Sequence, residues 1–115
     1  MASQFGDTVM SKVVGISYYR GLAEKMSLKR DPSNEVDENA IKVMDGNNVQ
    51  VGFIEKTSAK KLAPFLDEFA DDIEIKINPT SNINHSWYIT IAIEIWIAND
   101  SDKEDKVQKE LMLMK

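Results

Sequence analysis

Paired carboxylates and a single histidine are the residues of this chain whose types could support catalysis. Asp37-Glu38 and Asp71-Asp72 place two acids side by side, as general acid–base chemistry can use them. Adjacent residues of a strand point to opposite faces, however, so surface acids explain these pairs better. His85, the only histidine, lies in a stretch rich in turn-forming residues, which favours a solvated loop histidine over a general base. The sequence therefore predicts a protein that is not an enzyme.

Motifs that hold phosphates, metals or cofactors are also missing from the sequence. The five glycines form neither G-x-x-x-x-G-K-[ST] nor G-x-G-x-x-G. The lack of cysteine excludes disulfides, thiolate zinc sites and iron–sulfur ligation, and one histidine cannot form a pair of metal ligands. We therefore expect no metal and no cofactor.

The length and the charge distribution narrow the class of partner. A chain of 115 residues predicts one domain. Its net charge of −5 is uneven, because residues 1–61 sum to +1 and residues 62–115 to −6. The acidic half argues against extended wrapping of duplex DNA, but leaves open either a small polyanion site or a merely solvated acidic surface. No apolar run or signal peptide is present, so we expect a cytoplasmic protein with no membrane partner.

Short alternations of apolar residues predict strands along most of the chain. They occupy residues 12–19, 25–30, 40–44, 49–54, 73–77 and 87–97. In the last segment, isoleucines at every second position from 89 to 97 predict one buried face. Gly15 within the first segment suggests a bulge or a close backbone approach. Residues 1–11 are expected to be an N-terminal extension, followed by a single domain over 12–115.

Two segments change to the helical period, 57–69 and 100–115. Pro64 lies inside the first pattern, which predicts a kink or two short helices. The expected N-caps are Thr57 or Ser58 for the first helix and a Ser101–Glu104 capping box for the second. This order of elements predicts an α+β protein, mainly β, built on a curled antiparallel sheet or barrel.

The first half of the chain carries four motifs in a characteristic order. They are V-V-G-I-S-Y-Y-R-G at 13–21, L-K-R-D-P-S-N at 28–34, D-E-N-A-I-K-V at 37–43 and V-G-F-I at 51–54. This pattern strongly resembles the HIRAN domain, which is found at the N-terminus of SNF2-type ATPases such as helicase-like transcription factor and as a small stand-alone bacterial module. The resemblance covers about half of the chain. It implies an OB-like barrel that binds single-stranded DNA at a free 3′ end, with a role in DNA repair.

The same resemblance implies which residues form the DNA site. Tyr18 matches a tyrosine that stacks on a base, Asp37 an aspartate that binds the 3′-hydroxyl, Lys56 a lysine that contacts phosphate, and Trp87 a further aromatic residue of the pocket. The other candidate positions are Arg20, Asn34, Asn39 and Phe53. Stacking tolerates any base, and a carboxylate accepts a hydrogen bond from a hydroxyl but repels a phosphate.

Structural explanations for these residues stay open from the sequence. Asp37 and Asn39 could instead cap the polar loop at 31–40, and Trp87 could pack against the barrel. Tyr19, on the opposite face of the strand from Tyr18, is expected in the core.

Three positions depart from the family pattern. Ser17 replaces an arginine, Val36 replaces a second stacking tyrosine, and Phe53 replaces a histidine while still offering a ring. One phosphate contact and one stack are thus lost, so we expect weakened DNA binding that falls with added salt. The alternative is a protein-interaction or scaffold domain that keeps the fold without the DNA site, with a helicase, ATPase or other protein as its partner.

Overall fold

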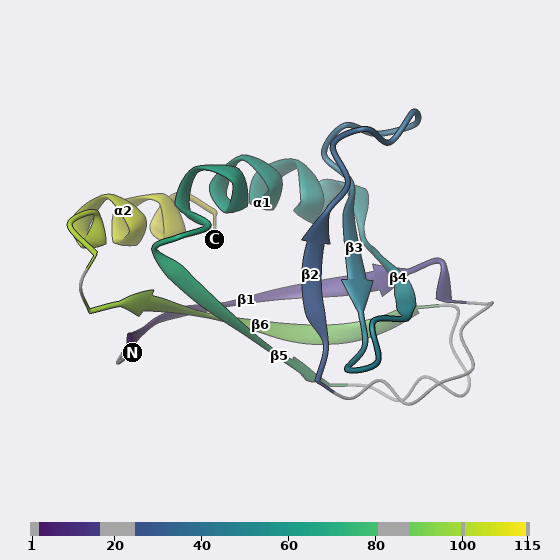
Figure 1. Cartoon of the computed structure of the whole chain (residues 1–115), viewed down its shortest axis with the longest axis horizontal. Helices are drawn as coiled ribbons and strands as arrows, with labels where there is room; N and C mark the ends of the chain where they lie inside the picture. The colour runs from purple at the N-terminus through teal and green to yellow at the C-terminus, as the bar shows by residue number, and fades with distance from the viewer. Residues whose placement is uncertain (1–2, 17–24, 81–87, 100, 115) are drawn as a thin grey trace.

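The computed structural model describes residues 3–16, 25–80, 88–99 and 101–114. These residues form six strands and two helices in the order expected for an α+β protein (Figure 1). In chain order they are β1 (Ser3–Val14), β2 (Ser27–Arg30), β3 (Ile41–Met44), β4 (Gln50–Ile54), α1 (Lys56–Phe69), β5 (Ile73–Pro79), β6 (Tyr88–Ala98) and α2 (Glu104–Met114). Neither described helix is both long and apolar enough to cross a membrane.

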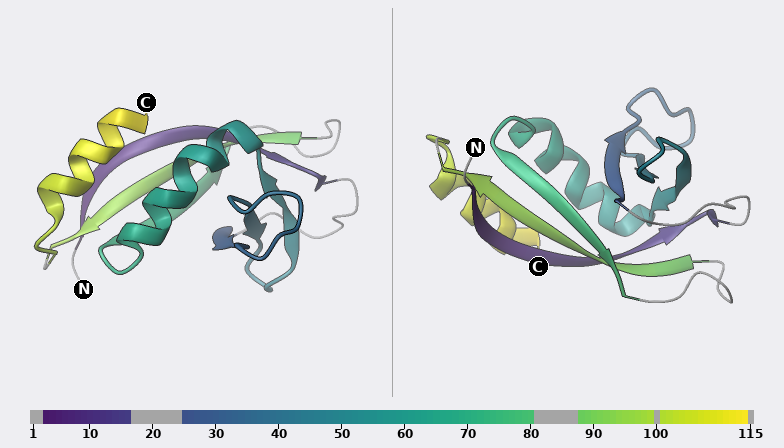
Figure 2. Two further views of the ribbon diagram at one scale, coloured as in Figure 1. Left: turned by 90° about the horizontal axis from the view of Figure 1, so that it is seen from above. Right: turned by 60° about the horizontal axis from the view of Figure 1, so that its bottom comes forward.

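The six strands form one antiparallel sheet in the order β2-β3-β4-β1-β6-β5. β1 pairs with β6 over its whole length but with β4 only through Val13 and Val14, so the sheet bends sharply at this point. Figure 2 shows both helices on the concave side of the curled sheet. The edge strands β2 and β5 approach each other, which makes the sheet a half-barrel. The prediction of a mainly β, OB-like fold with two helices is confirmed.

The core lies between the concave face of the sheet and the two helices. Five isoleucines of β6 are fully buried, as the alternation predicts: Ile89, Ile91, Ile93, Ile95 and Ile97. Burying each such side chain stabilises the fold by roughly 1.5–3 kcal/mol. α1 packs Leu62 and Phe69 against this face, and α2 adds Val107 and Leu111. The Phe65 and Phe69 rings meet at 5.1 Å.

The first strand differs from its predicted bounds. It begins at Ser3 rather than at residue 12, so residues 3–11 belong to the sheet and are not an extension outside it. Strand pairing rather than local sequence orders these residues, because β6 is eleven residues long and pairs with β1 along its whole edge. Gly15 follows the strand with a φ of +73°, which explains the glycine better than a bulge within the strand. The bulge of β1 lies between Phe5 and Asp7.

The predicted cap of the first helix is also wrong. α1 begins at Lys56 because the Glu55 carbonyl accepts the first helical hydrogen bond, from the Ala59 N–H at 2.9 Å. α1 runs as one helix from Lys56 to Phe69 with Pro64 inside it, so two short helices do not form.

The second helix, α2, begins after Lys103, whose carbonyl accepts the Val107 N–H. Ser101 lies two residues before this position, where its Oγ accepts the Lys103 N–H at 3.1 Å, as a capping serine does, and donates to the Asp72 carboxylate at 3.0 Å. The Ser101 N–H donates to the Ala98 carbonyl at 3.0 Å, so the reciprocal Glu104 contact of the capping box does not form.

Candidate functional site

A groove of about 340 Å³ opens where the loop at 31–40, hereafter the groove loop, faces the start of α1. The groove loop lies at the end of the molecule opposite α2 (Figure 1). The residues that line the groove are Val14, Asn34, Val36, Asp37, Ala40, Phe53, Ile54 and Lys56. Most of this lining is apolar. Its polar groups are the Asn34 amide, the Asp37 carboxylate and the Lys56 ammonium group. Four of the eight predicted site residues are thus brought together.

Asn34 organises the groove loop from within. Its Oδ1 accepts the backbone N–H groups of Val36 at 2.9 Å and Asp37 at 3.0 Å. Its Nδ2 donates to the Asp31 carboxylate at 3.1 Å. Because the side-chain amide is engaged on both sides, Asn34 fixes the turn that places Asp37 at the groove.

Asp37 combines a structural contact with a position at the groove. Its Oδ1 accepts the Asn39 N–H at 2.9 Å, and its carbonyl accepts the Ala40 N–H at 3.0 Å. Its Oδ2 has no hydrogen-bond partner among the described residues. One carboxylate oxygen therefore caps the loop, and the other remains available at the groove wall.

The aromatic ring and the ammonium group of the groove belong to Phe53 on β4 and to Lys56 on the next element, α1. Phe53 on β4 is half-buried and pairs with Val14 on β1, at the only place where these two strands meet. Lys56 is exposed at the first position of α1, whose first turn holds no acidic side chain. The Glu55 carboxylate at the N-cap accepts the Ser58 hydroxyl and so lies beside the positive end of the helix dipole, and Lys56 is the cation that this edge offers to the groove. A face of a ring, a carboxylate and a cation within one groove can together recognise a nucleotide.

The HIRAN domain profile matches residues 7–99 of the chain, which is most of its length. This chain belongs to the HIRAN domain family. A relative from Arabidopsis thaliana, a putative SWI/SNF-related matrix-associated actin-dependent regulator of chromatin subfamily A member 3-like 1, is 41% identical over 80 residues. That match covers 66% of this chain and 9% of the relative, so the chain spans only a small part of the relative's length.

Solved structures agree with the family assignment over nearly the whole chain. The crystal structure of the HIRAN domain of human HLTF matches with a TM-score of 0.80 and 29% identity, covering 97% of this chain and 92% of that one. The NMR structure of the HLTF HIRAN domain in its DNA-bound conformation matches with a TM-score of 0.67 and 27% identity, covering 97% and 91%.

Of the other four predicted site residues of this HIRAN domain, one does not line the groove and three lie outside the described residues. Asn39 is half-buried next to Asp37 and lies outside the set of described residues that line the groove. Tyr18, Arg20 and Trp87 lie outside the described residues, as do Ser17 and Tyr19. No group of acidic or histidine side chains that could hold a metal ion occurs in the described part of the chain.

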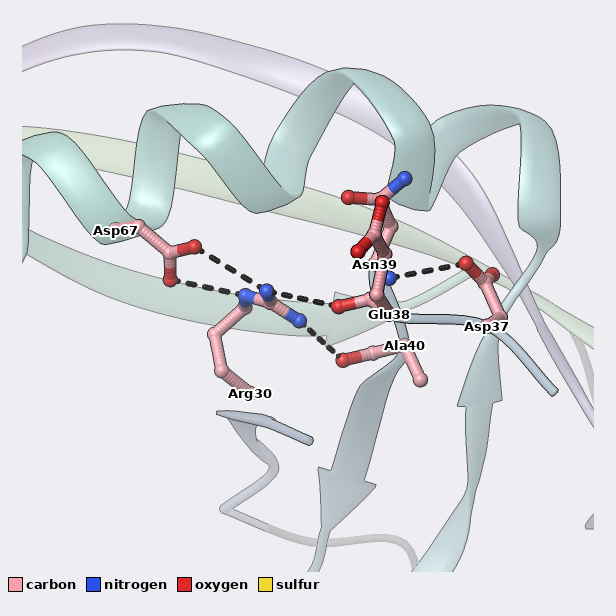
Figure 3. A network of polar contacts seen from close by, with 6 residues as sticks. All are labelled: Arg30, Asp37, Glu38, Asn39, Ala40 and Asp67. Carbon is pink, nitrogen blue, oxygen red and sulfur yellow. Dashed lines mark hydrogen bonds and ion pairs between the residues drawn. The ribbon is translucent and has the colours of Figure 1, made fainter. Parts of the chain in front are cut away.

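Arg30, which holds the groove loop from outside the groove, is the residue that the sequence interpretation missed. Its guanidinium donates to the carbonyls of Glu38 and Ala40 in the groove loop and to both carboxylate oxygens of Asp67 on α1 (Figure 3). The sequence held one indication, because Arg30 opens the R-D-P-S-N motif. An arginine at the end of a short strand, however, resembles an ordinary surface charge.

Proposed function

We propose that this HIRAN domain binds single-stranded DNA at a free 3′ end, with the terminal nucleotide in the groove. The observation that carries the proposal is the meeting of Asp37, Phe53 and Lys56 around one hollow. Its volume of about 340 Å³ lies within the range of small-ligand sites, roughly 300–1,000 Å³. The DNA-bound form of the related HLTF domain supports the same class of ligand.

Each group has a distinct part in this proposal. The Phe53 ring stacks on a base whatever its identity, which is worth roughly 1–3 kcal/mol per base. The open Oδ2 of Asp37 accepts a hydrogen bond from the 3′-hydroxyl and repels a 3′-phosphate. Lys56 attracts a backbone phosphate.

A test of this proposal compares three ligands: a short single strand ending in a 3′-hydroxyl, the same strand ending in a 3′-phosphate, and a blunt duplex. Fluorescence anisotropy with a 5′ label is expected to show tightest binding for the 3′-hydroxyl. Asp37→Asn is expected to abolish the preference over the 3′-phosphate, because the neutral amide no longer repels phosphate. Equal binding of both ends by the wild type would overturn end recognition.

Lys56→Ala tests the phosphate contact separately. For single strands, the slope of log affinity against log salt changes by about 0.7 for each phosphate contact. We therefore expect the slope for Lys56→Ala to be smaller by about 0.7 than the wild-type slope. Lys109→Ala, which removes an exposed lysine from α2 at the far end of the molecule, is the matched control. Identical salt slopes for wild type and Lys56→Ala would remove Lys56 from the site.

A protein-binding function is the second candidate, and one observation favours it. Val36 lies at the groove with 90% of its surface exposed, at a position where the family pattern has a stacking tyrosine. An exposed apolar side chain at this point suits a protein partner better than a base. No binding of any single strand at about 100 μM in low salt, where phosphate contacts are strongest, would favour this candidate.

A further inference from the structure

A pair of charged residues outside the groove joins the groove loop to α1. Arg30 ends β2, directly before the groove loop, and Asp67 lies near the end of α1. Neither residue lines the groove. Arg30 Nε lies 2.9 Å from Asp67 Oδ1, and Arg30 Nη2 lies 3.2 Å from Oδ2. This two-point geometry fixes the plane of the guanidinium.

The same guanidinium holds the backbone of the groove loop. Arg30 Nη1 donates to the Ala40 carbonyl at 2.7 Å, and Nη2 donates to the Glu38 carbonyl at 3.0 Å. The Ala40 carbonyl also accepts the Asp31 N–H at 2.9 Å, so both ends of the loop meet at this one oxygen. Asp37 lies directly before these two anchored carbonyls. A movement of the guanidinium would therefore move the carboxylate that faces the groove.

We propose that Arg30 is a positioning residue of the groove and that Asp67 locks it in place, so that this pair sets the discrimination between a 3′-hydroxyl and a 3′-phosphate. The inference rests on the proposed function. Figure 3 shows the chain of contacts on which it depends, from Asp67 through Arg30 to Glu38 and Ala40, with the Asp37–Asn39 contact beside it.

Burial explains why Asp67 is the better member to change. The Arg30 side chain is 18% exposed and holds carbonyls that would lose their partner in an alanine variant, which could unfold the loop. The Asp67 side chain is 55% exposed on the outside of α1. Alanine has a higher helix propensity than aspartate, so Asp67→Ala leaves the helix intact. An exposed ion pair alone contributes little to stability, so an effect on recognition is not a consequence of unfolding.

Glu68→Ala is a matched control, because Glu68 is the next residue on α1 and also makes an ion pair. Its Oε1 lies 2.7 Å from Lys106 Nζ on α2, away from the groove loop. The two variants change the net charge equally, so any general gain in attraction for DNA appears in both. Asp67→Glu keeps the carboxylate and tests whether a conservative replacement rescues the effect.

The experiment measures two quantities for the wild type, Asp67→Ala, Asp67→Glu and Glu68→Ala. The first is the ratio of dissociation constants for a 3′-phosphate and a 3′-hydroxyl strand. It is expected to fall at least threefold in Asp67→Ala, to recover in part in Asp67→Glu, and to stay unchanged in Glu68→Ala. The second, which needs no DNA, is amide hydrogen exchange at Asp31 and Ala40. It is expected to be at least threefold faster only in Asp67→Ala.

The outcomes separate this inference from the proposed function. If the wild type prefers the 3′-hydroxyl and Asp67→Ala keeps both the preference and the slow exchange, the positioning role is wrong and the proposed function stands. If the wild type shows no end preference, the proposed function fails, and the positioning role of Arg30 and Asp67 is then tested by the amide exchange rates alone. Faster exchange in Asp67→Ala but not in Glu68→Ala would then support the positioning of the loop, and equal rates would overturn it.

Discussion

Replacement of Gly52 by alanine is expected to lower the free energy of unfolding by about 3 kcal/mol, at the upper end of the cost of an extra methyl group in a packed interior. A Cβ at this position would lie 2.3 Å from the Val14 carbonyl oxygen and 3.0 Å from side-chain carbons of Val13 and Ile16. The obstructing atom is backbone, which cannot turn aside as a side chain can. Since β4 and β1 pair only next to this point, the strands must separate where the groove wall begins.

Chemical denaturation followed by circular dichroism measures this effect. Gly46→Ala is the matched control, because Gly46 is exposed in the turn between β3 and β4 and does not have a positive φ. Alanine is tolerated at such a position and restricts the unfolded chain, so the control should change stability by less than about 1 kcal/mol. A Gly52→Ala protein as stable as the Gly46→Ala protein would show that the two strands can move apart at little cost.

The elements that could be predicted from the sequence are those in which the local pattern and the tertiary environment agree. The isoleucines of β6 alternate without interruption, and each one is buried. The start of β1 could not be predicted, because residues 3–11 show no alternation and are ordered by pairing with β6. The start of α1 is likewise set from outside the helix. The Glu55 N–H donates to the Lys12 carbonyl of β1 at 2.9 Å, and the helix begins at the next residue.

The residues of the candidate site, like the elements of the fold, could be predicted from the sequence only in part. Asp37, Asn34, Phe53 and Lys56 came from a resemblance in motif, and the structure brings them to one groove. The sequence alone left two explanations for Asp37, and the geometry accommodates both, with one oxygen on the loop and one at the groove. Arg30 could not be found in this way. Its contacts join residues 30, 38, 40 and 67, and a separation of 37 residues leaves no periodicity or spacing to detect.

Phe53→Ala is expected to weaken binding of a 3′-hydroxyl single strand by about 5-fold to 150-fold, which corresponds to the roughly 1–3 kcal/mol of one base stack. Phe53 is the only aromatic side chain among the described residues that line the groove. Its ring is half-buried, whereas the next residue, Ile54, is buried in the core, so truncation at 53 should affect the groove more than the fold.

Stacking and simple apolar contact predict different results for two further variants. Phe53→Tyr keeps a ring face and should bind nearly as well as the wild type, whereas Phe53→Leu keeps apolar volume without a π-face and should bind like the alanine variant. Fluorescence anisotropy on the same labelled strand compares all four proteins. Equal binding by the leucine variant and the wild type would show that the groove holds the nucleotide by apolar contact.

A double-mutant cycle with an altered ligand identifies the base on which Phe53 stacks. The altered strand has the same length but lacks the base of its 3′-terminal nucleotide, which keeps its sugar and its 3′-hydroxyl. If Phe53 stacks on the terminal base, removal of the base and removal of the ring abolish the same interaction, so the two losses do not add. Phe53→Ala should then cost little on the abasic strand. A full loss on both strands would place the ring against another nucleotide and would leave Asp37 and Lys56 to recognise the end.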